Sequence, residues 1–99
     1  MVLTMKKLWE ILVPASQKRK LHRKWDKKVS KIAGGLTLFK PKKGRWISDG
    51  KIFIEKMIPV RIATTKKEIK KIVKFTAKHY NQKAVMYFLV SKQVKICQF

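Results

Sequence analysis

Short apolar runs along the chain predict extended strands. Residues 8–13 and 36–39 form two such runs, and Pro14 closes the first because proline has no backbone N–H to give to a strand ladder. Residues 45–47 resume the extended pattern. Asp49-Gly50 then predicts a hairpin turn, since these residue types accept the positive φ that the turn needs. Residues 84–90 predict the last strand, with residues 94–99 as its continuation or as a short further strand.

The longest predicted strand covers residues 51–63. One face of it carries the β-branched residues Ile52, Ile54, Ile58, Val60 and Ile62. The opposite face carries Phe53, Glu55, Met57 and Arg61. Because successive side chains of a strand point to opposite faces, this alternation predicts a strand with one buried side. Pro59 predicts a bulge or bend within it.

Residues 17–33 have apolar side chains at helical spacing. The stripe consists of Leu21, Trp25, Val29 and Ile32. We expect Ser16 to be the N-cap of this helix, because a serine hydroxyl can accept a hydrogen bond from a first-turn N–H. Gly34-Gly35 supplies the stop.

A second helix is predicted to begin at Thr65. Thr65 and Glu68 have the spacing of a capping box, in which the two side chains satisfy backbone N–H groups of the first turn. The expected inner stripe is Ile69, Ile72, Val73, Thr76 and Tyr80. Asn81 can end the helix in the left-handed conformation.

The order of these elements predicts an α+β fold of the ferredoxin-like, split βαβ type over residues 1–99 as one domain. Right-handed crossovers place both helices on one face of an antiparallel sheet, with the first and third strands in its centre. The other face stays open, and we expect Trp9, Phe53, Met57 and Phe88 to lie on it. Such apolar residues predict a homodimer that forms through the open sheet face.

Composition supports a folded protein inside the cell. Apolar residues make up 45% of the chain, which is far more than disordered segments carry. The single cysteine, Cys97, excludes an internal disulfide framework. No apolar run is long enough for a membrane-spanning helix, and residues 1–7 lack the apolar core of a secretion signal. We therefore expect a cytoplasmic protein with no membrane partner.

The charge is the feature that points most directly to a partner. The chain has 26 Lys and Arg residues against 5 Asp and Glu residues, which gives a net charge of +21. A surface of this charge attracts anions, although solubility or a lysine-biased genome would also explain it. Nucleic acid, or an anionic nucleotide, is the expected partner.

Two basic groups are candidate contacts for such a partner. Residues 39–46 place an aromatic residue at each end of a proline- and glycine-containing loop, whose candidate binding residues are Lys40, Lys42, Lys43, Arg45 and Trp46. Basic groups bind phosphates and flat rings stack on bases, as single-stranded nucleic acid requires. The alternative is that Phe39 and Trp46 are core or hairpin residues. The second group lies on the first helix and comprises Lys18, Arg19, Lys20 and Arg23.

Few residues suggest catalysis. His22 and His79 are a minority candidate for nuclease-like acid–base chemistry, but they lie on different predicted helices. The five carboxylates lack the paired spacings of Mg²⁺ sites, and no glycine-rich phosphate loop is present. We expect a protein that is not an enzyme and that uses no metal or cofactor.

Several short motifs resemble a pattern found in small uncharacterised bacterial, plasmid and phage proteins. They are Gly34-Gly35-Leu36-Thr37, Gly44-Arg45-Trp46, Asp49-Gly50-Lys51, Glu55 and Tyr80-Asn81-Gln82-Lys83-Ala84-Val85-Met86. The resemblance implies a ferredoxin-like domain and an origin on a mobile element, and it carries no site residue across.

The sequence thus predicts a small, basic, non-catalytic protein that binds RNA or single-stranded DNA. The alternative is a phage or plasmid counter-defence protein that sequesters an anionic nucleotide signal or occupies a host protein.

Overall fold

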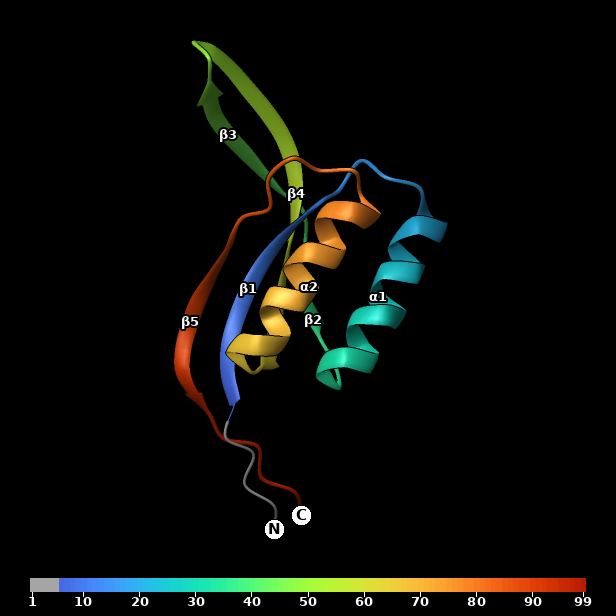
Figure 1. The fold of residues 1–99 in the computed structure, drawn as a ribbon, viewed down its shortest axis with the longest axis vertical. Coiled ribbons are helices and arrows are strands. Elements are labelled where there is room, and N and C mark those ends of the chain that lie inside the picture. Colours follow the sequence, from blue (N-terminus) through green and yellow to red (C-terminus); the bar gives the residue numbers. More distant parts are fainter. Residues whose placement is uncertain (1–5) are drawn as a thin grey trace.

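An antiparallel sheet with two helices on one face forms the structure, which is a computed structural model that describes residues 6–99 (Figure 1). The elements are β1 (Lys6–Pro14), α1 (Arg19–Ala33), β2 (Thr37–Leu38), β3 (Lys42–Ser48), β4 (Lys51–Thr64), α2 (Lys66–His79) and β5 (Tyr87–Val94). Strands β2, β4, β1 and β5 are neighbours in that order, and β3 also pairs with β4. The predicted ferredoxin-like arrangement with β1 and β4 in the centre is confirmed.

The core lies between the central strands and the two helices. Ile11 and Val60 are fully buried on the helix side of the sheet, and Trp25 and Ile72 meet them from α1 and α2. Burying each such side chain contributes about 1.5–3 kcal/mol, so this layer is the main source of stability. The apolar stripes predicted for both helices are the ones that face it.

Trp9 lies in this core, so its predicted position on the open sheet face is wrong. The residue is 8% exposed, and its indole N–H donates to the carbonyl of Thr64 at 3.1 Å. Trp9 is two residues from Ile11, and residues at that spacing point to the same face of a strand. The apolar character of the open face is correspondingly lower than the sequence suggested.

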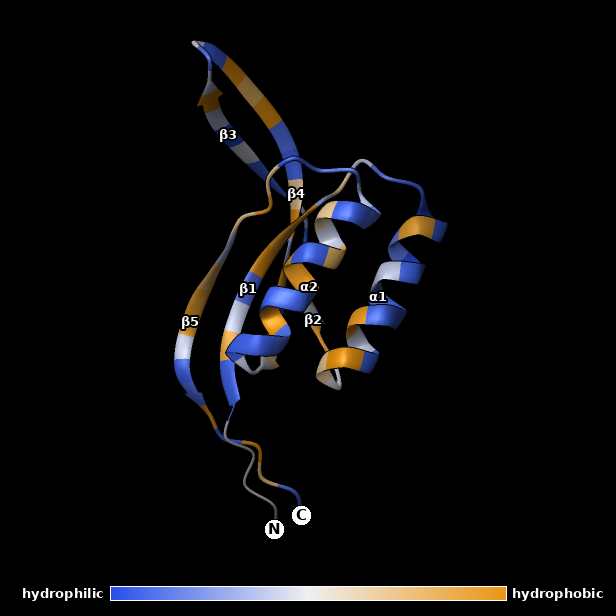
Figure 2. Ribbon diagram, in the orientation of Figure 1, coloured by the Kyte–Doolittle hydropathy of each residue, from blue (hydrophilic) through white to orange (hydrophobic). Residues whose placement is uncertain are grey.

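The β3–β4 hairpin extends beyond the helices and gives the molecule its length of 51 Å against widths of 28 and 24 Å (Figure 1). Asp49 and Gly50 have φ values of 51° and 74°, which confirms the predicted turn. Ile52 and Ile54 share a face with buried Val60, yet they are 64% and 55% exposed because no helix reaches this far. Figure 2 shows the resulting hydrophobic bands along the hairpin.

Pro59 does not produce the predicted bulge. It pairs with Leu12 in a register that runs unbroken along β1 and β4. Its carbonyl accepts a hydrogen bond from the N–H of Phe39 at 3.0 Å, so its nitrogen also faces the β2 side of the strand. Strand β2 pairs with β4 as far as Val60, and β3 pairs with it from Met57 onward. Pro59, which has no N–H, therefore lies in the gap between β2 and β3 along that edge of β4. The irregular pairing lies instead between β1 and β5, near Leu8.

The helix ends follow local chemistry, with one exception. Ser16 is not the N-cap of α1; Lys18 is, because its carbonyl accepts the first helical hydrogen bonds while its side chain makes no capping bond. Gly34 ends α1 with φ of 87°, as predicted.

At α2 the backbone N–H of Glu68 donates to the Thr65 hydroxyl at 3.1 Å, which confirms half of the capping box. The Glu68 carboxylate accepts from the hydroxyls of Thr64 and Thr65 and not from a backbone N–H.

The last strand is displaced from its predicted position. It covers Tyr87–Val94 and not residues 84–90, and residues 95–99 form no strand. Its last residue, Val94, pairs with Lys6, the first residue of β1 that the structure describes. Asn81 follows α2 with φ of 52°, in agreement with the prediction.

Candidate functional site

The first group of predicted binding residues lies along the hairpin. Lys40 is in the connection between β2 and β3, whereas Lys42, Lys43, Arg45 and Trp46 belong to β3 itself, so most of the predicted loop is a strand. The Trp46 ring stacks on Phe53 with centroids 6.1 Å apart and planes 15° apart, and it is 42% exposed. Trp46 is therefore a half-covered hairpin residue, which is the alternative that the sequence left open.

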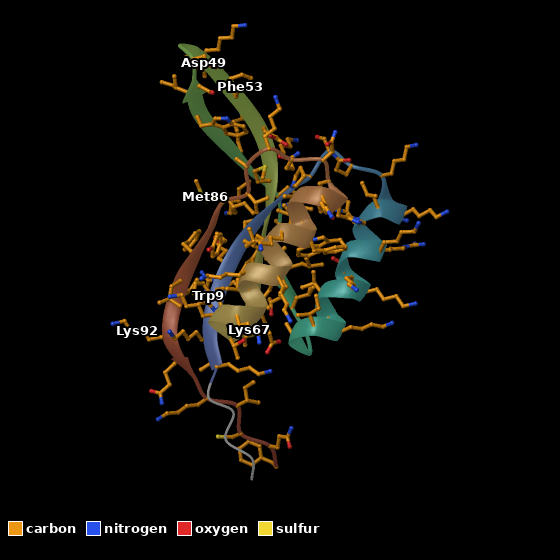
Figure 3. All side chains as sticks on the ribbon, viewed as in Figure 1. Trp9, Asp49, Phe53, Lys67, Met86 and Lys92 are labelled. Atoms are coloured by element: carbon orange, nitrogen blue, oxygen red, sulfur yellow. The ribbon has the colours of Figure 1, made fainter. Side chains whose placement is uncertain are left out.

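The second group lies on α1. Lys18, Arg19, Lys20 and Arg23 are all exposed. No hydrogen bond joins them to the hairpin group in the part of the chain that the structure describes. Figure 3 shows that long basic side chains leave the fold in many directions, with Lys67 on α2 and Lys92 on β5. The positive charge is spread over the surface. Its one local concentration in a hollow among residues 6–99 lies on α2 and is lined by Lys66, Lys67, Lys70, Lys71 and Lys74, none of which belongs to the two predicted groups.

The two histidines meet around Tyr80, although no sequence pattern brings them together. His22 contacts the Tyr80 hydroxyl through Nδ1 at 2.8 Å and the Ala15 carbonyl through Nε2 at 3.3 Å. A carbonyl can only accept, so Nε2 carries the proton and Nδ1 accepts from Tyr80. His79 donates through Nε2 to the Leu21 carbonyl at 2.7 Å. These bonds join α1 to α2, and His22 uses both ring nitrogens within the protein.

A cavity of about 170 Å³ lies next to His22, and we call it the Asp26 cavity. Its walls come from α1, from the central strands and from residues 38–41, and the residues that line it are Val13, His22, Trp25, Asp26, Leu38, Phe39, Pro41, Ile58 and Val60. Most of the walls are apolar. Sequence reasoning missed this site, although Asp26 follows His22 by four residues and therefore shares a helix face with it.

Burial perturbs the acidic groups around the cavity. It raises the pKa of the Asp26 carboxyl above the ordinary value of 3.8, and the nearby His22 lowers that pKa in part. Burial also raises the pKa of the Tyr80 hydroxyl, and the charge of Asp26 raises it further. In both groups the larger cause is the removal of a negative charge from water.

We expect Asp26→Asn to stabilise the protein at neutral pH. A carboxyl whose pKa is raised by folding favours the folded state only while it is protonated, so this contribution is present below pH 3.8 and is lost as pH rises. Asparagine stays neutral throughout. Thermal melts should show the variant melting higher than the parent at pH 7, and the difference should shrink toward about pH 3.5. Equal melting temperatures at pH 7 would contradict this.

The open sheet face carries an ion pair. Glu10 lies opposite Arg61 in the β1–β4 register, and Arg61 Nε donates to Glu10 Oε1 at 3.1 Å. The Arg61 guanidinium also lies 5.2 Å from the centroid of the Phe39 ring. The Arg61 side chain is 41% exposed, and a pair with one partner in solvent contributes about 1 kcal/mol or less. It places polar groups at the centre of the face that the sequence predicted to be an apolar dimer interface.

The described residues form neither a metal-binding cluster nor a membrane-spanning helix. Within residues 6–99, no three His, Cys, Asp or Glu side chains come together in a way that could hold a metal ion. No helix among the same residues is long and apolar enough to cross a membrane.

Comparison with known proteins identifies the fold. No family model and no curated protein matches the chain, so the resemblance to phage and plasmid proteins stays a prediction. Among solved structures, the divalent cation tolerance protein CutA1 from Thermus thermophilus is similar, with a TM-score of 0.69 and 12% identity over 87% of this chain and 82% of that one.

Two further structures agree. CutA1 from Oryza sativa has a TM-score of 0.68 and 9% identity over 98% of this chain and 84% of that one. The PII-like protein CutA from Nostoc sp. PCC 7120 has a TM-score of 0.62 and 10% identity over 86% and 79%. At such identities the likeness establishes the fold.

These neighbours correct the functional prediction. The Thermus thermophilus protein is named for divalent cation tolerance, and the other two share the name CutA1 or CutA. This finding contradicts both the binding of RNA or single-stranded DNA and the sequestering of a nucleotide signal. The prediction failed because net charge by itself determines no function, and here the lysines and arginines are distributed over most of the fold.

Proposed function

We propose that the protein works in tolerance to divalent cations, as a non-catalytic protein that assembles with copies of itself. The similarity in fold carries this proposal. It extends over 87% of this chain and 82% of the Thermus thermophilus divalent cation tolerance protein. A bacterial and a plant protein of the same name support it equally.

The charge of the chain bears on how such a role would work. A net charge of +21 opposes the accumulation of free divalent cations at the surface. We therefore propose that the protein supports tolerance without storing metal. In this proposal the assembled protein, through the contacts that it makes, contributes to cation tolerance.

Two exposed apolar surfaces support self-assembly. The hairpin surface consists of Trp46, Ile47, Ile52, Phe53 and Ile54, and the β5 surface consists of Met86, Tyr87, Phe88, Leu89 and Val90. Figure 2 shows both as hydrophobic bands at the margins of the fold. In both surfaces the exposed apolar side chains lie on both faces of the strands, and clusters of exposed apolar side chains are typical of protein interfaces. In the described part of the chain, β3 and β5 each also have one edge without a partner strand.

The position of these surfaces favours a head-to-tail contact. The hairpin surface and the β5 surface belong to opposite margins of the sheet, so one copy can present the first to the second of its neighbour (Figure 1). A contact between two different surfaces closes into a ring when the rotation between copies permits it. The homodimer through the open sheet face is the alternative, and the mass of the assembly separates the two.

Growth under metal stress tests the proposed role. Cells whose expression of this chain is abolished should stop growing at lower concentrations of Cu²⁺ or Zn²⁺ than cells that express it, and a plasmid copy should restore growth. Purified protein should carry well under one metal ion per chain by elemental mass spectrometry, since its charge repels cations. Identical growth curves with and without the chain would refute the role, and stoichiometric metal would refute the proposal that no metal is stored.

A further inference from the structure

We propose that the Asp26 cavity binds a small, neutral, planar apolar molecule that carries one hydrogen-bond donor. This inference goes beyond the proposed role in cation tolerance and does not depend on it. It rests on the size of the cavity, the character of its walls and the carboxylate that lines it.

The size and the walls determine the body of the ligand. A volume of about 170 Å³ is close to that of an apolar cavity of about 150 Å³ that is known to bind benzene. Val13, Ile58 and Val60 line it from the sheet, Trp25 lines it from α1, and Leu38 and Phe39 line it from the end of β2 and the residue after it. One ring or two fused rings would fill this space and displace water from apolar walls.

The polar groups of the cavity determine which functional group the ligand must carry. The nitrogens of His22 are already bonded to Tyr80 and Ala15. The Asp26 carboxylate, in contrast, has neither a side-chain hydrogen bond nor an ion pair with any residue in the range 6–99, and neither of its oxygens is fully buried. An ionised carboxylate only accepts hydrogen bonds. A ligand that satisfies it therefore needs an N–H or O–H group.

The charge of the whole protein selects a neutral donor. At +21 the surface repels an ammonium group, whereas a neutral N–H or O–H meets no such barrier. A hydrogen bond from a neutral donor to a carboxylate is still charge-assisted and is roughly twice as strong as one between neutral groups. Asp26 is partly exposed, so solvent screens part of this gain.

The rim of the cavity is suited to entry. Leu38 is 51% exposed and Phe39 is 41% exposed, so the outer wall is in contact with solvent. The Arg61 guanidinium lies over the Phe39 ring and helps to keep it in place. Trp25 is fixed from inside by its indole N–H, which donates to the Thr76 hydroxyl at 2.9 Å. The inner wall is thus rigid and the outer wall accessible, as in a preformed small-molecule site.

Indole and benzofuran test the proposal, because they have nearly the same shape and only indole has a donor. Titration of ¹⁵N-labelled protein, followed by NMR, should show indole shifting the side-chain N–H signal of Trp25. Benzofuran should bind about tenfold more weakly, since it leaves Asp26 without a partner. Asp26→Leu, which is close in volume, should weaken indole about tenfold and leave benzofuran unchanged.

Two further variants complete the test. Asp49→Asn removes a carboxylate at the hairpin tip and should leave both affinities unchanged. Asp26→Asn keeps a hydrogen-bond acceptor but removes the charge. Indole should therefore bind this variant with an affinity between those of the parent and of Asp26→Leu. If the leucine variant does not fold, the comparison of the parent with Asp26→Asn tests the proposal. Equal affinities of indole and benzofuran for the parent protein, or an indole affinity that does not respond to Asp26→Asn, would overturn the proposal.

Discussion

Trp25→Ala should lower the free energy of unfolding by about 3–5 kcal/mol, because it removes one of the largest fully buried side chains of the core. The substitution leaves a cavity between α1 and the sheet, and it also removes the hydrogen bond from the indole to Thr76. Domains of this size have a total stability of about 5–15 kcal/mol, so the variant should be close to unfolding at about 37 °C. The melting temperature should fall by roughly 15–30 °C.

Trp46→Ala is the matched control, since it removes the same side chain from the surface. Trp46 is 42% exposed, and its stacking on Phe53 contributes about 0.5–1.5 kcal/mol. Thermal unfolding of both variants, followed by circular dichroism at one protein concentration, should therefore give a much smaller decrease for Trp46→Ala. Equal decreases in melting temperature for the two variants would contradict the assignment of Trp25 to the core and of Trp46 to the hairpin surface.

The double variant Ile52→Gln/Ile54→Gln should dissociate the proposed assembly. These side chains are 64% and 55% exposed in the single chain, and burial of each in an interface contributes about 1.5–3 kcal/mol. Losing both should raise the dissociation constant about a hundredfold or more. Sedimentation velocity should show the parent protein as a multiple of 11.7 kDa and the variant as a single chain at micromolar concentration.

The control for this prediction is Lys24→Gln/Lys28→Gln on the exposed side of α1. It introduces the same polar residue at two positions outside both apolar surfaces, so the assembly should keep its mass. A parent protein that sediments as a single chain throughout the micromolar range would contradict the proposed assembly. If the hairpin variant keeps the mass of the parent assembly, the hairpin surface is not part of the interface.

The mass of the assembly distinguishes the hairpin contact from the open sheet face. An assembly of more than two chains would support head-to-tail contacts between the hairpin surface and the β5 surface. A dimer that tolerates the hairpin variant would favour the open face, where Glu10 and Arg61 form their ion pair. The two arrangements therefore differ both in mass and in their response to one variant.

Local chemistry made several features of the fold predictable from the sequence. Positive φ at Asp49 and Gly50, the left-handed end of α1 at Gly34 and the bond from Glu68 to Thr65 all involve residues close together in the chain. Alternation correctly placed Val60 and Ile62 on the buried side of β4. Signals of this kind act within a turn or a strand, so they do not depend on what packs nearby.

The candidate site could not be predicted in the same way. His22, Asp26, Phe39 and Val60 come from different parts of the chain, and the Asp26 cavity exists only because α1 and the end of β2 leave a space over the sheet. Periodicity shows that residues share a face, but it does not show how closely two faces approach. Trp9 is a different case, because alternation with Ile11 along β1 already places it on the buried face of the sheet.

The sequence by itself determined the order of the elements, the turns and caps, the charge of +21 and the residues available for the core. The tertiary structure alone decided where the helices stop covering the sheet, and hence that Ile52 and Ile54 are exposed while Ile62 is buried on the same face. It also decided that the positive charge is dispersed and that Asp26 borders a cavity. The physical reason is that burial and electrostatic environment depend on neighbours distant in sequence, whereas turns and caps depend on neighbours along the chain.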